Sequence, residues 1–456
     1  MEQAKCHEIP DFHKNQTERF FSIWTTGFEY SLAARAPDCP PLASLAVSEQ
    51  IPDSCVRARV GLRSPSLARA RVRAKESPMS LRAMSADSHM DLIYLPPDTF
   101  TSRMASSWRE RAPHVVERDG RKVWVSGDAV LGPWGVYGPG VTGGRRGRIL
   151  AEAGFASGTQ TRPSNPAERR QDQERDGVEA EIIYGIIGIS RGLFTHSGIA
   201  DHETLAAVYR AYNDYVADFN RSEPGRFFGL GCLPNHDAGA AADEVRHCAE
   251  LGLRGAVFVP WGAALPVWHP IWEPLWAAAE DTGLVVSFHV FEGGAATVGY
   301  AVQGIQSPAS AGSWTVVAPL QMDEICASVI LSGVCERHPK LTLVLGESGI
   351  GWLPYILERL DDTYEERLAD DLKLKLPPSA YFKRQMYATF QKDFHGVRAM
   401  AEIAPDNVMW GSDYPHRDGT WPFSQKAIEE QFRGIAPAVQ SKMLWENVRR
   451  VYKIVP

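Results

Sequence analysis

Eight apolar runs, each about as long as a β-strand, constrain the fold of this chain more than any other feature. Helical patterns separate most of them, and the signal "DHET" at 201–204 opens one long amphipathic run to about residue 222. Short buried strands that alternate with helices are typical of α/β folds. The runs cover residues 86–90, 180–187, 226–233, 255–260, 284–290, 341–347, 386–390 and 407–413.

This alternation predicts a (β/α)8 TIM barrel over residues 84–456. The runner-up is an open doubly wound sheet, but no G-x-G-x-x-G pattern follows the first run. Residues 91–177 are too long for a simple loop, so we expect an insertion that forms a lid or a dimer contact. Within it, the string "PPDTFTSRMASSWRERAP" at 96–113 predicts a helix after the prolines.

Residues 1–83 differ from the rest of the chain, because they show no sustained period of 2 or 3.6. Seven basic residues and no acidic one lie between 54 and 75. The pattern favours a disordered N-terminal extension, or upstream sequence that is not translated in the native protein. A basic arm that binds anions is the alternative. No apolar segment of the signal-peptide kind is found at the N-terminus, so secretion is not expected.

The composition narrows the classes of partner and compartment. The formal net charge of −7 argues against nucleic acid or an anionic membrane as the main partner. The chain has no apolar run long enough to suggest a membrane span. Its seven cysteines form no C-x-x-C motif, which favours reduced thiols and a cytoplasmic protein.

Charged residues and histidines recur at the C-terminal ends of the predicted strands, where TIM barrels carry their chemistry. Asp87 and His89 alternate, so both point into the barrel mouth. Each such residue has a structural explanation, since a lone strand histidine is more often part of the core than a ligand. Gathering so many charged groups at one end of the barrel costs free energy unless a cation compensates their charge. Imidazole and carboxylate ligands together suit zinc or manganese. The set is Asp87, His89, His289, Glu347 and Asp413.

Several strings carry a resemblance to a known family: "ADSHMD", "RDGVEAEIIYG", "SFHV", "LSGVCERHPKLTLVLGESGIGWLPYILERLDD", "WGSDYPH" and the terminal "ENVRRVYKI". Residues 85–456 resemble the amidohydrolase-related family. The similar branch includes 2-amino-3-carboxymuconate-6-semialdehyde decarboxylase and γ-resorcylate decarboxylase. The resemblance implies a metal-dependent barrel enzyme, a small carboxylate substrate and a homodimer.

The resemblance also implies roles for individual residues. Asp87 and His89 match a first-strand ligand motif that is His-x-His or Glu-x-His in the family, so Asp87 is a departure. His289 matches the histidine ligand of the fifth strand, and Asp413 matches an aspartate that lies at the metal and transfers protons. Glu347 stands where the similar decarboxylases have histidine. We expect Glu347 to be a further ligand, with a role as a base as the alternative.

The ligand set leaves the reaction open. In a decarboxylase, Asp413 would supply the proton that replaces CO2. In a hydrolase or hydratase of a ring-cleavage product, ester, lactone or amide, Asp413 or Glu347 would be the base that activates water. A barrel that only binds a small molecule is a further alternative. Asp91 is expected to begin the insertion rather than join the metal site.

Further residues near the predicted strand ends are candidates for substrate contacts. His416 lies three residues after Asp413 and is a candidate catalytic residue that orients substrate. Arg191 follows the second strand and could clamp a carboxylate. Aromatic residues after other strands could form a wall for a planar acid. The substrate-binding candidates are Arg191, His236, Trp261, Trp352 and Phe390.

Overall fold

The computed structural model describes most of the chain after residue 80. It describes residues 81–455 except 109, 136–160, 187–197, 264, 291–311, 313–314 and 417. The predicted N-terminal extension therefore lies almost wholly outside the described residues, and its boundary at 83/84 stays a prediction. Arg191 and residues 136–160 of the insertion also lie outside the described residues.

The strands form where the apolar runs predict them. All eight runs contain parallel strands, and the third is split by Leu230 into two short pieces. The strands are β1 (Met84–His89), β5 (Ala180–Tyr184), β6 (Phe227–Gly229), β7 (Gly231–Leu233), β8 (Gly255–Phe258), β9 (Val285–His289), β10 (Leu343–Gly346), β11 (Met386–Phe390) and β12 (Val408–Trp410).

The parallel strands form two sheets, ordered β1-β5-β6 and β12-β11-β10-β9-β8-β7. The two sheets meet at two junctions. At one junction, the Leu230 amide between β6 and β7 donates to the Ile183 carbonyl of β5 at 2.9 Å. At the other, the Asp413 amide donates to the Asp87 carbonyl at 2.7 Å, which joins the chain after β12 to β1. The strands thus follow one another in sequence order, as in the (β/α)8 barrel that the sequence predicts.

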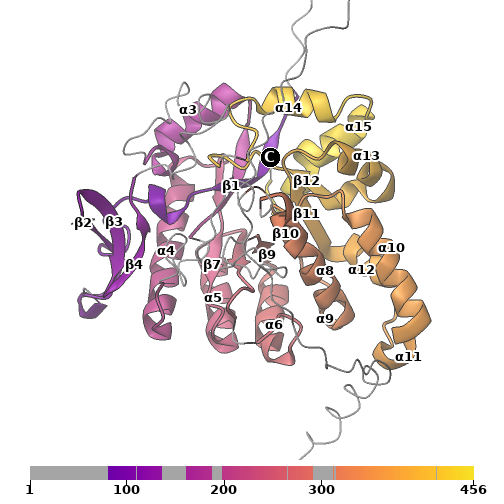
Figure 1. Cartoon of the computed structure of the whole chain (residues 1–456), viewed down its shortest axis with the longest axis horizontal. Coiled ribbons are helices and arrows are strands. Elements are labelled where there is room, and N and C mark those ends of the chain that lie inside the picture. Colours follow the sequence, from indigo (N-terminus) through magenta and orange to yellow (C-terminus); the bar gives the residue numbers. More distant parts are fainter. Residues whose placement is uncertain are drawn as a thin grey trace, which may run out of the picture. The chain divides into compact units, whose positions relative to one another are not determined.

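Helices cover the outside of the strands (Figure 1). Aspartates cap several of them: the side chains of Asp201, Asp237 and Asp393 each accept a hydrogen bond from a first-turn amide. The longer helices are α4 (His202–Ser222), α5 (Ala238–Glu250), α6 (Glu273–Thr282), α8 (Gln321–Leu331), α10 (Leu353–Thr363), α12 (Pro378–Gln385), α13 (Phe394–Ile403) and α14 (Ser424–Gln431). The described part of the chain also contains the short helices α9 (Val334–Arg337), α11 (Ala369–Leu372), α15 (Pro437–Ser441) and α16 (Asn447–Val451).

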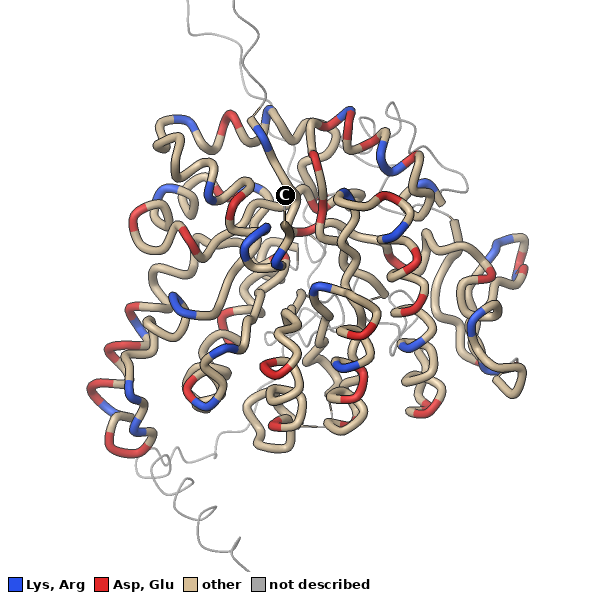
Figure 2. The backbone as a smooth tube through the Cα atoms, turned by 180° about the vertical axis from the view of Figure 1, so that it is seen from behind, with Lys and Arg blue, Asp and Glu red and all other residues tan. Residues whose placement is uncertain are grey.

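Two apolar cores follow from the alternation of side chains along each strand. One lies inside the ring of strands and includes Ala86, Ile182 and Val344. The other lies between the strands and the helices and includes Phe288 and Trp410. Acidic and basic residues share the outward faces of the helices (Figure 2). Every helix in the described part of the chain is too short or too polar to cross a membrane.

The insertion after β1 differs from the expectation. It contains an antiparallel sheet of β2 (His114–Arg118), β3 (Arg121–Ser126) and β4 (Ala129–Pro133), seen at the edge of Figure 1. Its helix α3 (Pro166–Asp176) returns the chain to the barrel. The helix predicted within 96–113 is wrong, because turns and one 3-10 helix occupy this segment. The Thr99 hydroxyl there donates to the Pro96 carbonyl, and such local bonds compete with helix formation.

Candidate metal centre and active site

The five residues predicted as ligands come together at one end of the barrel. Asp87 and His89 lie on β1, His289 ends β9, and Glu347 directly follows β10. Asp413 lies three residues after β12. Four of these side chains are buried, and that of Glu347 is 22% exposed. The barrel mouth therefore gathers carboxylates and imidazoles from four separate strands.

The distances between ligand atoms form a connected set. His89 Nε2 lies 3.5 Å from Asp87 Oδ1 and 3.4 Å from Asp413 Oδ1. His289 Nε2 lies 3.5 Å from the same Asp87 oxygen and 3.6 Å from Glu347 Oε2. Two atoms that each lie about 2.1 Å from a tetrahedral zinc ion are about 3.4 Å apart. Neighbouring pairs are therefore spaced as ligands of a divalent cation would be. They fall into two groups that share His89: one of Asp87, His89 and His289, and one of His89, Glu347, Asp413 and His416.

Several buried atoms of this cluster lack hydrogen-bond partners, which is a second indication of a metal site. No hydrogen bond within the described residues reaches Asp87 Oδ1, His89 Nε2, His289 Nε2 or Asp413 Oδ2, although all four are buried. His289 Nδ1 lies 2.8 Å from the Val290 carbonyl, which leaves Nε2 with its lone pair toward the site. Buried polar atoms without partners are unfavourable unless an ion satisfies them. The residues present thus fit a divalent metal.

Backbone strain accompanies two of these carboxylates. Glu347 has a φ of 49° and Asp413 a φ of 54°, both in the left-handed region that non-glycine residues rarely adopt. Such conformations cost about 1–3 kcal/mol each and cluster at functional sites. The conformation of Asp413 accompanies the hydrogen bond from its amide to β1.

Asp91 and His416 form a second group of charges beside the metal cluster. His416 Nδ1 lies 2.9 Å from Asp413 Oδ1, and its Nε2 is hydrogen-bonded to Asp91 Oδ2 at 2.8 Å. Asp91 Oδ1 lies 3.5 Å from His89 Nδ1. The imidazole of His416 stacks on that of His89, with 3.9 Å between ring centroids. Asp91, which is expected to begin the insertion, therefore contacts two residues of the site, His89 and His416.

The charges in this mouth shift one another's pKa values. Burial alone would raise the pKa of Asp87, but His289 and His89 hold it below its usual range. Burial opposes the charged form of His416, yet Asp413 and Asp91 raise its pKa well above the usual value. Burial raises the pKa of Glu347 well above its usual range, and the charge of Asp413 adds to this effect. A cation would relieve the repulsion among these carboxylates.

The substrate-binding candidates lie in different environments. Trp261 packs against both cores just beyond β8, and its buried indole Nε1 has no hydrogen-bond partner within the described part of the chain. His236 stacks on His202 with 4.3 Å between ring centroids. Trp352 donates from its indole Nε1 to the Ser348 carbonyl at 2.8 Å.

Two further residues near this end correct the sequence reading. Phe390 does not reach the mouth: it is fully buried and packs on Phe432, because alternation along β11 turns it toward the helices. Tyr184 was not anticipated, although its ring lies 4.6 Å from that of His289 and 5.8 Å from that of His89. It is the last residue of β5, and this strand-end position was the available signal.

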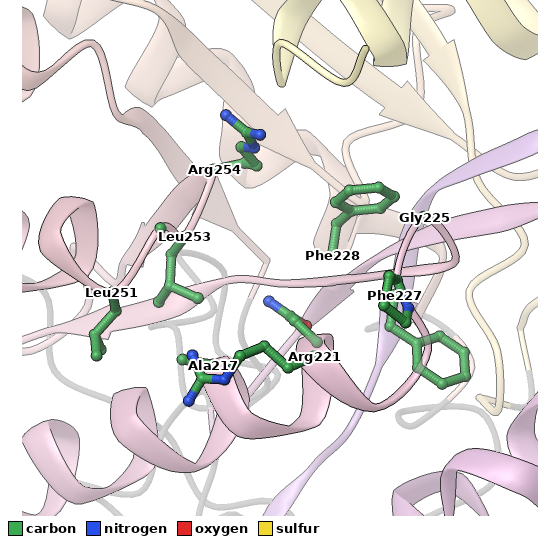
Figure 3. Close-up of a pocket in the computed structure, with 11 residues that line it drawn as sticks. Ala217, Arg221, Gly225, Phe227, Phe228, Leu251, Leu253 and Arg254 are labelled. Atoms are coloured by element: carbon green, nitrogen blue, oxygen red, sulfur yellow. The ribbon is translucent and has the colours of Figure 1, made fainter. Parts of the chain in front are cut away.

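A cavity of about 460 Å³ lies at the opposite end of the barrel. Figure 3 shows Phe227 and Phe228, at the start of β6, together with Leu253 and Arg254, which precede β8. In such barrels, residues at the N-terminal ends of the strands contribute to stability, whereas residues at the C-terminal ends carry the chemistry. This cavity is therefore separate from the ligand cluster.

Known proteins share both the sequence pattern and the fold. Residues 163–454, more than half of the chain, match the model of the amidohydrolase family. γ-Resorcylate decarboxylase of Rhizobium sp. (strain MTP-10005) is 26% identical over 275 residues, which are 56% of this chain and 79% of that protein.

Solved structures agree on the fold. An amidohydrolase from Mycobacterium avium subsp. paratuberculosis K-10 superposes with a TM-score of 0.65 at 19% identity, covering 83% of this chain and 99% of that one. A dihydroxybenzoic acid decarboxylase from Polaromonas sp. JS666 with bound manganese has a TM-score of 0.51 at 17% identity, covering 82% and 97%. The chain described here belongs to the amidohydrolase family, and it is an enzyme of that superfamily, as its sequence predicted.

Proposed function

We propose that this protein is a metal-dependent decarboxylase, a carboxy-lyase that acts on a small aromatic or unsaturated carboxylic acid. The observation that carries the proposal is the buried Asp413 carboxylate, which faces the ligand cluster and has His416 2.9 Å away. The similarity to γ-resorcylate decarboxylase supports the reaction class. Zinc suits the mixture of imidazole and carboxylate, and manganese is the alternative.

In this proposal, Asp87, His89 and His289 hold the metal, with Asp413 beside them and Glu347 as a further ligand. When bound, the divalent cation supplies positive charge against the negative charge that develops on the substrate oxygens. The buried walls exclude water, which strengthens every charge interaction in the site.

Asp413 is the proposed proton donor. When the bond between the substrate carbon and its carboxylate breaks, CO2 leaves and the electron pair stays on the carbon. The Asp413 carboxyl donates a proton to that carbon and becomes a carboxylate. His416, which bridges Asp413 and Asp91, lies in position to return a proton to Asp413 from solvent.

A planar acid would be held by residues around the mouth. Trp261 offers an aromatic face and an indole N–H that has no hydrogen-bond partner among the described residues. His236 follows β7, next to the strand that precedes Trp261, and Trp352 follows β10. Arg191 is proposed to contact the substrate carboxylate. We also propose that the enzyme works in the cytoplasm as a homodimer with the 91–177 insertion at the contact. The free, buried cysteines of the described chain fit a reducing compartment.

A hydrolase or hydratase is the second candidate function. Glu347 favours it, because its raised pKa and its place at the end of β10 suit a general base or acid in water chemistry. A barrel that binds a small molecule without catalysis is a third candidate.

Release of CO2 from a panel of hydroxybenzoates tests the proposal. The zinc- or manganese-loaded protein should release CO2 from at least one of them, and Asp413→Asn should abolish this release. Asp243→Asn, an exposed change on α5, is the matched control and should leave it intact. No CO2 release together with turnover of esters, lactones or ring-cleavage products would establish the hydrolase instead.

A further inference from the structure

We propose that Thr389 is a positioning residue that fixes Asp87 as a metal ligand through one oxygen only. This inference rests on the metal site proposed above, but not on the reaction that the site catalyses. Thr389 lies on β11, whereas Asp87 lies on β1, so the contact spans separate strands of the barrel. Both side chains are fully buried.

Three short contacts define the arrangement. The Thr389 hydroxyl donates to Asp87 Oδ2 at 2.6 Å. The backbone amide of Glu347 lies 2.7 Å from the same carboxylate oxygen and 2.7 Å from the Thr389 hydroxyl oxygen. Hydrogen bonds to an ionised carboxylate are among the stronger ones in proteins.

The two oxygens of Asp87 therefore have opposite surroundings. Oδ2 accepts hydrogen bonds from two donors, the Thr389 hydroxyl and the Glu347 amide. Among the described residues no donor reaches Oδ1, which lies 3.5 Å from the Nε2 atoms of both His89 and His289. A carboxylate held in this way presents a single oxygen to a cation. Without the hydroxyl, rotation of the carboxylate about its last bond would be opposed by the Glu347 amide alone.

The backbone makes this contact possible. Alternation along β11 turns Thr389 to the inside of the barrel, because Phe390 beside it faces the helices. The Ser348 hydroxyl donates to the Thr389 carbonyl at 3.1 Å and holds this strand against the chain after β10. The left-handed φ of Glu347 accompanies the direction of its amide toward Asp87. The left-handed conformation of Glu347 and the hydroxyl of Thr389 thus both help to hold the Asp87 carboxylate.

Two pairs of variants isolate the hydroxyl. Thr389→Val replaces it with a methyl group of similar size, and Thr389→Ser and Thr389→Ala differ from each other in the hydroxyl alone. Zinc affinity of each metal-free protein is measured by competition with a chromophoric chelator. Within both pairs, we expect the protein without the hydroxyl to bind zinc about 10–100-fold more weakly, as for other residues that orient metal ligands. Thr99→Val, at a buried threonine of the insertion, is the control and should bind as the wild type does.

The thermal midpoints of the metal-free proteins separate positioning from folding. We expect Thr389→Ser to restore zinc affinity even though its loss of a methyl group lowers the midpoint. Equal affinity within the two pairs would overturn the role of Thr389 while leaving the metal site in place. If Thr389→Val does not fold, the Ser and Ala variants decide the question. A wild-type protein that binds neither zinc nor manganese would overturn both this inference and the proposed function.

Discussion

The two roles proposed for Glu347, metal ligand and general base, predict different results for the same variant. Glu347→Gln keeps the shape of the side chain but removes its charge. Because Glu347 Oε2 lies 3.6 Å from His289 Nε2, we expect a ligand role and a zinc affinity reduced at least tenfold. The measurement is zinc competition together with kcat. Unchanged affinity with a large fall in kcat would instead assign Glu347 as the base.

Asp91 sets the charge state of His416, which gives a prediction about pH. Because Asp413 and Asp91 raise the pKa of His416, its imidazolium persists to higher pH than that of an ordinary histidine and is lost as the pH rises through the raised pKa. Asp91→Asn removes one of the two charges that raise it, so the alkaline fall in kcat should move to lower pH. The pH profile of kcat checks this, with Asp128→Asn in the exposed turn after β3 as the control. An unmoved alkaline limb would contradict the role of Asp91.

The residues of the site differ in how far the sequence could reveal them. Asp87 and His89 occupy alternating positions at a strand end, so the pattern itself indicates one shared face. Asp91 lies beyond the strand, and its contacts with His89 and His416 were not expected. Thr389 had no such signal, because a single threonine in an apolar strand is ordinary and its partner lies 302 residues away. Phe390 was misplaced because an aromatic residue at a strand end fits either face.

Strand β10 ends at a glycine that the ligand geometry requires. A Cβ on Gly346 would lie 2.7 Å from His289 Cδ2 and 2.9 Å from the Phe288 carbonyl oxygen. Gly346→Ala should therefore displace His289, lower the free energy of unfolding by about 1–3 kcal/mol and weaken zinc binding. Urea unfolding and zinc competition measure both effects. Gly312→Ala, where an added Cβ meets no atom of the described residues within 4 Å, is the control. Wild-type zinc affinity in Gly346→Ala would contradict this account.

Helix α3 is tied to β1 by a buried arginine. Arg169 forms an ion pair with Glu181 and donates to the carbonyl of His89, a proposed metal ligand, at 2.8 Å. Arg169→Met leaves Glu181 buried without its partner, so we expect a loss of about 3–5 kcal/mol of unfolding free energy. The loss should be smaller when Glu181→Gln is also present. Urea unfolding of the four proteins of this cycle checks the coupling, and additive effects would contradict it.

At the scale of elements, the barrel strands were predictable and the insertion was not. A strand buried on both faces leaves a continuous apolar run, and eight such runs define the barrel. The sheet of β2, β3 and β4 is half exposed, so its apolar pattern is weak. Its clearest signal was Asp119-Gly120, which forms the turn between β2 and β3 with positive φ at both residues.

Across the whole molecule, the charges of the site and the cavity lie at opposite ends of the barrel. The ends of β1, β9 and β10 and the chain after β12 present the carboxylates and imidazoles, whereas the cavity of Figure 3 lies where β6 and β8 begin. The direction of the strands alone predicts, from the sequence, that the charged residues of the site gather at one end of the barrel. The cavity depends on how the end of α4 packs against the loop before β8, and no local pattern encodes that packing.

The metal content of the purified protein tests the central claim most directly. Elemental analysis by mass spectrometry, after dialysis against metal-free buffer at neutral pH, should find one equivalent of zinc or manganese per chain. His289→Ala should lose it, because this change removes a ligand whose Nε2 has no other partner in the described structure. A folded wild-type protein that contains neither metal, and takes up neither when it is supplied, would contradict the account.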